Sequence, residues 1–377
     1  MNKIHKKHPS IVKFSLATVI CLIFTLGCSS TSEKNTNNTS SATPIATVSK
    51  TTDEISVMTF NVENLFDTVH DEGTEDYTNL PLSEKQKPEV QKFCSEVKIS
   101  YYRSECYTKN WDAEALKFKL SQLSKVIRNT DNGKGPDAIM MAEVENQNVL
   151  NQLVKTELKD LGYQTVVVIE GPDLRGIDPA FISKFPLAEK PKLHLIPYTD
   201  PDPEQLKHAK RSRGILEVTV ILPNKKNLTF LIGHFPSQAA PTAWRKQASE
   251  FATKKMLELA AENKAVIMGG DLNITADEED SSGYFSKIFS TAGQVSHLVG
   301  CKNCEGSHFY KGHWSFLDVQ IYGNKIDQAG LQLIPESITV LKTPVHMKRN
   351  GTPLRFSEEK KEGVSDHFPL YSRLRLK

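Results

Sequence analysis

The sequence feature that most constrains the fold is a short apolar run that ends in two glycines and then in polar residues. The four residues from Ala265 to Met268 are all apolar, which predicts a fully buried strand. Gly269 and Gly270 follow and permit backbone angles and close approaches that a Cβ would forbid. Asp271 and Asn273 come next, and an extended chain places side chains at this spacing on one face. Ligands bind at such strand ends in α/β proteins, although an ordinary turn explains this stretch alone equally well.

The same pattern recurs along the chain, because predicted buried strands repeatedly border on acids, amides or histidines. These polar residues are Asn61 and Glu63 after 55–60, Glu143 after 137–142, His234 after 228–233, and Asp366 and His367 before 370–374. A further acid, Asp318, lies inside the otherwise apolar stretch 314–322, where a carboxylate is costly unless it is paired. Each residue alone has an ordinary explanation as a helix cap, a core histidine, a turn residue or a structural partner. Their joint occurrence favours a functional site.

The remaining patterns predict an α/β fold in which two mixed sheets pack face to face with helices outside. Leucines at helical spacing predict a helix over 112–129, with Asp112 as its N-cap. The other expected elements are a helix capped by Asn146, a helix over 241–261, strands at 166–169 and 180–183, and a hairpin of 214–222 with 228–233. Residues 67–110 lack such a pattern and are predicted to form a surface insertion that narrows substrate choice.

The N-terminus is typical of an exported protein. Residues 1–27 combine a lysine-bearing start with an apolar run from Phe14 to Gly27 that is too short to span a bilayer comfortably, which predicts a signal peptide. The segment ends in a sequence that resembles a bacterial lipoprotein box, with Cys28 as the residue to be lipidated; plain secretion is the alternative. Residues 28–53 are rich in Ser, Thr and Asn and are expected to tether the domain, which spans 54–377.

Charge and cysteine content narrow the function further. Without the four lysines of residues 1–27, the chain holds 43 basic and 45 acidic side chains, so it has no overall electrostatic footprint for DNA. Export favours disulfides, and we expect Cys94 to pair with Cys106 and Cys301 with Cys304. A zinc site at Cys301 and Cys304 is the weaker alternative, since a second cysteine pair is missing.

The polar set suits hydrolysis of a phosphate ester. Oxygen ligands from Glu, Asp and Asn suit a hard cation such as Mg²⁺, whereas the sequence shows no His-rich or Cys-rich set of the kind that zinc prefers. A histidine held by an acid acts on the attacking water, and Asp318 with His367 has that character. His234 would supply a second donor to the phosphoryl oxygens.

Several motifs in this order resemble the endonuclease/exonuclease/phosphatase superfamily, which includes DNase I-like nucleases, sphingomyelinases and inositol-phosphate phosphatases. The motifs are Thr59-Phe-Asn-Val-Glu-Asn64, Ala142-Glu143, Gly176 to Ser183, Gly233-His-Phe-Pro-Ser237, Gly270-Asp-Leu-Asn273, Trp314-Ser-Phe-Leu-Asp318 and Ser365-Asp-His367. The resemblance covers about residues 54 to 375. It implies a DNase I-like four-layer α/β sandwich and a divalent metal, usually Mg²⁺, with Mn²⁺ or Ca²⁺ as alternatives.

The resemblance also implies roles for individual residues. Glu143 corresponds to the metal carboxylate with Asn61 beside it, and Asp366 to an acid close to the metal. Asp271 corresponds to the residue that orients or activates water, and Asn273 to the phosphate contact. His367 with Asp318 corresponds to the catalytic pair, and His234 to a second histidine of the family. Gly176-Ile-Asp178 replaces the tyrosine of the apurinic-site nucleases, which argues against abasic-site repair. Arg175 and Asp178 are expected either to contact substrate or to pair with each other.

The sequence thus predicts an exported, lipid-anchored, metal-dependent phosphoesterase of the cell envelope, with a nuclease or related phosphodiesterase favoured. Its partners would be a nucleic acid substrate and the membrane, with no obligate protein partner. The alternative substrates are phospholipid headgroups and sugar or inositol phosphates, and no exposed aromatic hairpin suited to a membrane is evident. A surface lipoprotein that keeps the fold and only binds a partner is the alternative of another class.

Overall fold

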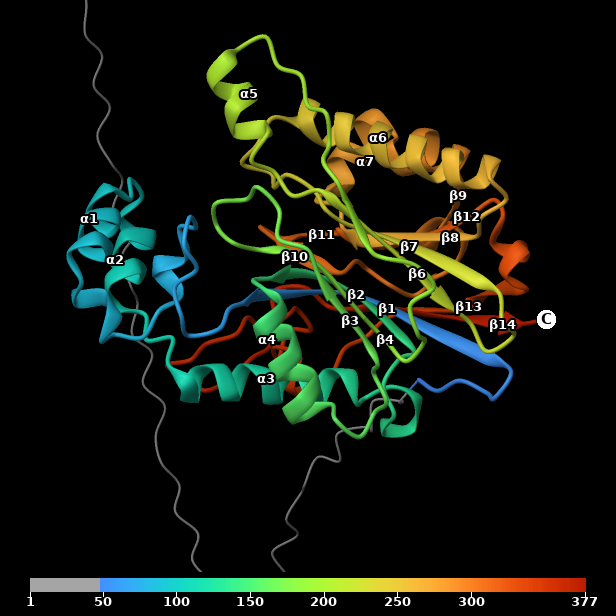
Figure 1. Ribbon diagram of the computed structural model, residues 1–377, viewed down its shortest axis with the longest axis horizontal. Helices are drawn as coiled ribbons and strands as arrows, with labels where there is room; N and C mark the ends of the chain where they lie inside the picture. Colours follow the sequence, from blue (N-terminus) through green and yellow to red (C-terminus); the bar gives the residue numbers. More distant parts are fainter. Residues whose placement is uncertain (1–47) are drawn as a thin grey trace, which may run out of the picture. The chain divides into compact units, whose positions relative to one another are not determined.

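The computed structural model describes residues 48–377, and within them two six-stranded sheets pack face to face between helices (Figure 1). The predicted signal peptide, Cys28 and most of the predicted tether lie outside the described residues. Within the part of the chain that the structure describes, no helix has the length and apolar character needed to cross a membrane.

The first sheet joins the beginning of the domain to its last strand. Its order is β13 (Leu331–Val340), β14 (Leu370–Leu376), β1 (Glu54–Leu65), β2 (Ala138–Val144), β4 (Asp178–Ser183) and β3 (Thr165–Val168). Only the β1–β2 pair is parallel, and the other neighbours are antiparallel.

The second sheet has the same plan. Its order is β5 (Lys192–His194), β6 (Ile215–Ile221), β7 (Asn227–His234), β8 (Val266–Asp271), β12 (Asp318–Gly323) and β9 (Gly293–Val295). Here β7–β8 is the one parallel pair. Because both parallel pairs are central, the carboxyl ends of four core strands become available for one site.

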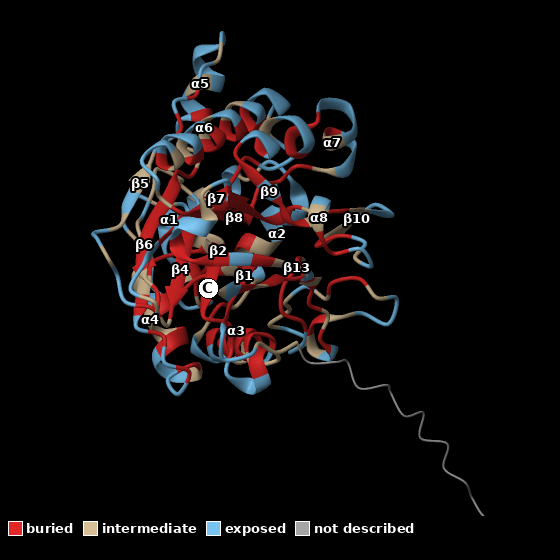
Figure 2. Cartoon of the chain, turned by 90° about the vertical axis from the view of Figure 1, so that its right-hand side faces the viewer, coloured by how far each residue is buried: buried red, intermediate tan, exposed pale blue. Residues whose placement is uncertain are grey.

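Helices cover the two outer faces. The helices α3 (Ala113–Ile127) and α4 (Gln147–Gln152) lie on the first sheet, whereas α6 (Thr242–Ala261) and α7 (Ala276–Ser282) lie on the side of the second (Figure 1). Short helices α5 (Pro203–Ala209) and α8 (Ser296–Val299) complete this part of the chain. Figure 2 shows buried residues concentrated in the sheets and on the inner faces of these helices, as a four-layer sandwich requires.

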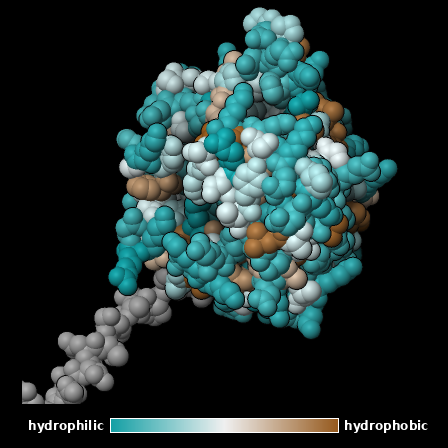
Figure 3. Space-filling model, turned by 90° about the vertical axis from the view of Figure 1, so that its left-hand side faces the viewer, coloured by the Kyte–Doolittle hydropathy of each residue, from teal (hydrophilic) through white to brown (hydrophobic). Residues whose placement is uncertain are grey.

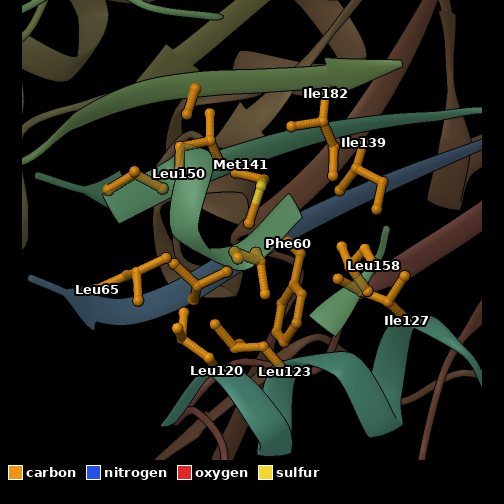
Figure 4. Close-up of a cluster of buried hydrophobic side chains, with 14 of the residues drawn as sticks. Phe60, Leu65, Leu120, Leu123, Ile127, Ile139, Met141, Leu150, Leu158 and Ile182 are labelled. Atoms are coloured by element: carbon orange, nitrogen blue, oxygen red, sulfur yellow. The ribbon is translucent and has the colours of Figure 1, made fainter. Parts of the chain in front are cut away.

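The alternation of β1 explains why the sheet needs both layers. Phe60 belongs to a cluster with Leu120, Leu123 and Ile127 of α3 (Figure 4), whereas Val57 belongs to the cluster between the two sheets. Burial of both faces removes apolar surface from water at roughly 25 cal/mol per Å². Polar links also cross between the sheets, since the Gln320 side-chain amide donates to the carbonyl of Val57 at 3.2 Å.

The segment 67–110 folds as a small helical unit at one end of the sandwich. Its helices α1 (Pro88–Glu96) and α2 (Ser100–Thr108) are joined by the disulfide between Cys94 and Cys106. The Lys85 ammonium, buried beneath them, donates to the carbonyls of Thr78 and Cys106 at 2.9 and 2.8 Å. The structure also joins Cys301 to Cys304, so these thiols form a disulfide in it and no zinc site.

Three local predictions need correction. The first strand continues beyond Phe60 to Leu65, because a register shift between Asn61 and Leu65 lets the chain keep its pairing. The stretch 314–322 is not one strand: β11 (His313–Ser315) pairs with β10 (His308–Tyr310), and β12 begins at Asp318. The hairpin itself was not predicted; of its aromatic residues Tyr310 is exposed, whereas Phe309 and Trp314 are half-buried.

Candidate active site

The polar strand ends of both sheets meet at one place. Asn61 of β1 pairs in register with Ala142, the residue before Glu143, and His234 of β7 pairs with Asp271 of β8. Asp318, the first residue of β12, pairs with Asp271 from the other side. The register aligns the polar residues within each sheet, and the packing of the two sheets then brings together Asn61 and Asp318, which are 257 positions apart in the chain.

The backbone at these strand ends is unusual. Glu63, Asn64, Glu143 and Asn273 all have positive φ values, of 50°, 55°, 66° and 52°. Such left-handed conformations are uncommon for residues with a side chain and cluster at functional sites. They change the direction of the chain at or near the ends of β1, β2 and β8, where the polar residues of the site lie.

Gly269 permits β8 to pack closely against the first sheet, and Gly270 permits close packing against the neighbouring strand β7. A Cβ on Gly270, whose φ is 137°, would lie 1.8 Å from the carbonyl oxygen of Gly233, and one on Gly269 would lie 2.4 Å from Cε of Met140. The first contact is sterically impossible, and although Met140 could move, a Cβ on Gly269 would also lie 2.8 Å from the carbonyl oxygen of Val319. The glycines are thus required by the close packing of β8, as the sequence predicted for this stretch.

Asn61 is the central connector of the site. Its side-chain NH2 donates to Oε1 of Glu143 at 3.2 Å and to Oδ2 of Asp271 at 2.9 Å, and its backbone N–H donates to Oδ1 of Asp318 at 3.2 Å. Its side-chain oxygen accepts from the N–H of Glu63 at 2.9 Å. In this orientation Asn61 holds the carboxylates in place, and its predicted role as a metal ligand stays a prediction.

His367 is fixed by an acid on one side and leaves its other nitrogen free. Its Nδ1 lies 2.7 Å from Oδ2 of Asp318, and its backbone N–H donates to Oγ of Ser365 at 3.1 Å. Burial opposes a positive charge on this ring, but the carboxylates of Asp318 and Asp271 outweigh it and raise the pKa of His367 well above its usual value. The predicted pair is thus in hydrogen-bond contact, with Nε2 facing the site.

Asp271 lies between the two histidines of the site. Its Oδ2 is 3.8 Å from Nε2 of His367 and 3.8 Å from Nε2 of His234. Burial raises the pKa of the Asp271 carboxyl to about 7, despite the nearby His367 that favours its charge. A carboxylate whose pKa lies near neutrality suits a residue that accepts a proton from water.

His234 and Asn273 complete the floor of the site. Burial lowers the pKa of His234 well below its usual value, which favours the neutral ring, and its buried Nδ1 has no hydrogen-bond partner in the described residues. Asn273 donates its backbone N–H to Oδ1 of Asp271 at 2.9 Å and its side-chain NH2 to the carbonyl of Phe235 at 3.1 Å. Asn273 thus positions Asp271, whereas its predicted contact with phosphate stays a prediction.

Asp366 faces a cation that sequence reasoning missed. Its carboxylate is 3.9 Å from Nε2 of His367 and 3.6 Å from the guanidinium of Arg355, which also contacts Glu63 at 2.6 Å. Arg355 lies in a segment with no apolar period, so only the tertiary fold reveals it. The sequence analysis also missed His308, which is half-buried on the unpredicted hairpin. The centroid of its ring lies 4.6 Å from that of His367, so it borders the site.

Arg175 and Asp178 do not pair with each other. Arg175 is exposed at the rim and donates to Oδ1 of Asn64 at 3.0 Å, so it remains available to an anionic substrate. Asp178 is buried and accepts from the N–H of Gly171 at 3.0 Å, so its role in the structure is to hold the 171–177 loop. The cation beside this loop is instead Arg213, which contacts Asp173 at 2.7 Å.

The donors present fit a hard divalent cation. Glu143 keeps 15% of its side chain exposed, and its two oxygens accept from Asn61 and from the N–H of Asn64, so lone pairs remain for an ion. Together with Asp271 it offers carboxylate oxygens, which are the ligands that Mg²⁺ prefers. Glu143 would hold the ion, and Asp366 borders the space beside it from the side of His367.

A cleft of about 950 Å³ opens beside the site at Glu63, Asn64 and Arg355. Helix α2 and the segment 354–362 form its walls, with Tyr101, Phe118 and Phe356 among the aromatic residues. Its lining has seven carboxylates and five cationic side chains, so it is not a basic channel. The face that carries α1 and α2 is mainly hydrophilic, with hydrophobic residues scattered over it (Figure 3).

Comparison with known proteins agrees with this architecture. A family model described as "Endonuclease/Exonuclease/phosphatase family" matches residues 97–376, whereas no curated protein sequence matches. Truncated TDP2 from Caenorhabditis elegans is 13% identical, with a TM-score of 0.51 over 85% of this chain and 97% of that one. An endonuclease/exonuclease/phosphatase from Beutenbergia cavernae is 13% identical, with a TM-score of 0.51 over 86% and 72%.

A third similar structure is a mannosyl-6-phosphatase from Bacteroides thetaiotaomicron, which is 13% identical, with a TM-score of 0.50 over 85% of this chain and 99% of that one. At these identities the structures support the DNase I-like sandwich only, and the family model carries the assignment of the chain. Members of this family are divalent-metal-dependent hydrolases of phosphate esters. The chain therefore belongs to the endonuclease/exonuclease/phosphatase family, and it is a metal-dependent phosphoesterase.

Proposed function

We propose that this phosphoesterase hydrolyses phosphodiesters and acts as a nuclease outside the cytoplasm. The observation that carries the proposal is the position of Asp271, with a histidine Nε2 at 3.8 Å on each of two sides. A diester needs a group that accepts a proton from water and a second group that serves an oxygen of the phosphate or the leaving group. Asp271 supplies the proton acceptor, and the histidines on either side of it supply the groups that donate to the phosphate oxygens and the leaving group.

The residues of the chain divide the work as follows. Asp271, with its pKa near 7, accepts the proton of the attacking water, and Asn61 and Asn273 hold its two oxygens in position. His367, kept protonated by Asp318, donates to the phosphate or to the leaving oxygen. His234 faces the same space from the opposite sheet and donates to a non-bridging oxygen. A divalent ion at Glu143, for which we propose Mg²⁺, would neutralise charge that grows on the phosphoryl group.

The sequence supports a location outside the cytoplasm. Residues 1–27 have the composition of a signal peptide, and Cys28 follows them in a lipobox-like setting, which supports a lipid-anchored protein of the cell envelope. The two disulfides are of the kind that persists in oxidising compartments. Both observations support export, and neither identifies the membrane.

A second candidate substrate is a small phosphate ester of a sugar. The specific observation is the cleft beside the site, whose carboxylates outnumber its cations, because a long polyanion would meet repulsion along that path. A neutral sugar would instead use the polar groups and the face of Tyr101. The nuclease proposal therefore needs the nucleic acid to pass over the rim near Arg175.

Residues 29–377 should be assayed with plasmid DNA, with bis(p-nitrophenyl) phosphate and with hexose phosphates, each with Mg²⁺ and with a chelator. The nuclease proposal predicts metal-dependent cleavage of DNA that disappears in His367→Ala. Release of phosphate from the hexose phosphates alone would replace it with the sugar candidate. Failure on all three substrates by a folded protein that binds Mg²⁺ would contradict both.

A further inference from the structure

Three possible metal ligands of a different kind lie together at the edge of the site. His308, Asp366 and His367 each offer one ligand atom, and these atoms lie within 4.8 Å of one another. His308 comes from the hairpin of β10 and β11, and the other two come from the turn before β14. In the sequence this trio is invisible, because 58 residues separate His308 from Asp366.

The backbone holds these two segments in contact. His308 forms a bridge with His367, and the N–H of Phe368 donates to the carbonyl of Ser307 at 2.8 Å. The imidazole rings lie 4.6 Å apart and are tilted by 38°. The two histidines are thus placed by main-chain contacts, and one ligand atom of each lies within 4.8 Å of the other and of a carboxylate oxygen of Asp366.

The surroundings also orient the individual donors. Asp318 binds Nδ1 of His367 at 2.7 Å, which leaves Nε2 as the free nitrogen, and a carboxylate in this position is the usual partner of a metal-binding histidine. Arg355 approaches Oδ2 of Asp366, whereas Oδ1 lies 3.9 Å from Nε2 of His367. One oxygen of Asp366 is therefore directed toward the histidines.

The chemistry of this trio differs from that of the oxygen cluster. Two imidazoles and one carboxylate form a donor set that favours Zn²⁺ and other late divalent transition metals over Mg²⁺. Zinc sites of this kind have three protein ligands and a water in the fourth position. Glu143 and Asp271 offer only oxygens and keep their preference for a hard ion.

We propose that His308, Asp366 and His367 form an inhibitory site for Zn²⁺, separate from the Mg²⁺ position at Glu143. An ion there occupies Nε2 of His367, and that nitrogen is then no longer available to donate a proton. Zinc binding and magnesium-dependent turnover would exclude each other even though the two ions use different principal ligands. The binding part of this proposal is independent of the substrate, whereas the inhibition rests on the proposed role of His367.

The test compares His308→Phe with His313→Phe. Phenylalanine keeps an aromatic ring beside His367 but removes both ring nitrogens, and His313 is an exposed histidine of the same hairpin that is not part of the trio. Zinc binding is measured by calorimetry in excess Mg²⁺, with Co²⁺ absorption as a probe of the ligand set. Inhibition by zinc is measured with bis(p-nitrophenyl) phosphate and normalised to the zinc-free rate of each variant.

We expect one zinc ion per chain in the unchanged protein and in His313→Phe, and binding at least about tenfold weaker in His308→Phe, with inhibition weakened in parallel. Equal binding and inhibition in all three would place zinc on the oxygen cluster and overturn the proposal. Absence of binding in excess Mg²⁺ would overturn it as well. Binding that depends on His308 but leaves turnover unaffected would refute the inhibitory role while keeping the site.

Discussion

The catalytic cluster and the 67–110 insertion are built in opposite ways. The cluster gathers single residues from both sheets, almost all buried, and each is tied to the next by hydrogen bonds across strands. The insertion is a continuous segment with its own small core around Cys94 and Cys106, and it exposes Tyr101 and Tyr102. The first arrangement holds its side chains through hydrogen bonds to one another, whereas the second shapes one wall of a cleft.

This difference suggests a division between rate and selectivity. Changes in the cluster should alter the chemical step for every substrate, because in the proposed mechanism its acids and histidines act on the phosphate and the attacking water. Changes in the insertion should alter which molecules reach the phosphate, because the insertion contributes to the cleft and not to the cluster. The five predictions below test that separation in order of expected effect.

His367→Ala should lower kcat by about 10³-fold on any phosphodiester, since it removes the proton donor. The loss should leave the melting temperature within a few degrees of the original. His208→Ala, at an exposed histidine of α5, is the matched control and should be fully active. Substantial activity of His367→Ala would remove this residue from the mechanism and end the proposed separation.

Asp318→Asn should reduce kcat by about 10- to 100-fold, because an orienting partner is lost while the proton donor remains. It should also change the pH profile. Burial already disfavours charge on His367, so without Asp318 its pKa falls and the decline of activity at high pH begins at a lower pH than before. The profile of kcat/KM against pH measures this shift, and Asp327→Asn, at an exposed acid, is the control. An unchanged decline of activity at high pH in Asp318→Asn would contradict the prediction.

Glu143→Gln should raise the Mg²⁺ concentration needed for half-maximal activity by about 10- to 100-fold. The amide keeps the shape of the side chain but loses the charge that holds the ion. Glu114→Gln, an exposed carboxylate at the cleft, should leave the magnesium requirement as it was. Identical titrations for Glu143→Gln and the unchanged protein would remove Glu143 from the ligand set.

Cys94→Ser with Cys106→Ser should destabilise the insertion by about 3 kcal/mol, the chain-entropy value for a loop of this length. Cleavage by a protease within 67–110 should accelerate, while kcat for bis(p-nitrophenyl) phosphate should stay the same. Opening the shorter Cys301–Cys304 loop should cost less, about 2 kcal/mol. A drop in kcat equal to that of a cluster variant would show that the two regions are not separate.

Tyr101→Ala should raise KM by about two- to fivefold for substrates long enough to reach the cleft, the loss expected for one exposed aromatic contact. It should leave the small diester unaffected. Tyr102→Ala is the matched control, because Tyr102 is exposed beside it but does not line the cleft. Equal effects of the two variants would argue against a specific contact at Tyr101.

Much of the fold was predictable because the core strands are short apolar runs buried on both faces and the main helices carry apolar residues at helical spacing. The helix over 112–129, with its Asp112 cap, and the helix over 241–261 agree with α3 and α6 to within two residues at each end. The hairpin of β6 and β7 and the two-sheet plan are also confirmed. The hairpin of β10 and β11 and helices α1 and α2 were missed, since their short or polar sequences carry no clear period. The strand β13 was missed because Pro335 and a register shift between Ile334 and Thr339 interrupt its alternation.

The members of the site were predictable, but their contacts were not. Glu143, His234 and Asp271 could be identified because each is a polar residue that follows an apolar run, and this pattern can be recognised in the sequence alone. The orientation of the Asn61 amide and the neighbours Arg355 and His308 depend on the tertiary fold, and no local pattern encodes them.

The pairing of β1 with β14 has a consequence for how the enzyme acquires its activity. Glu54 pairs with Arg375, so the first core strand of the domain is adjacent to the last, and contact order is high. Asn61 and His367 flank this seam. During refolding, hydrolysis should consequently return as one of the last observable events, after secondary structure and after collapse. The rate at which turnover recovers would then measure the rate at which β1 pairs with β14.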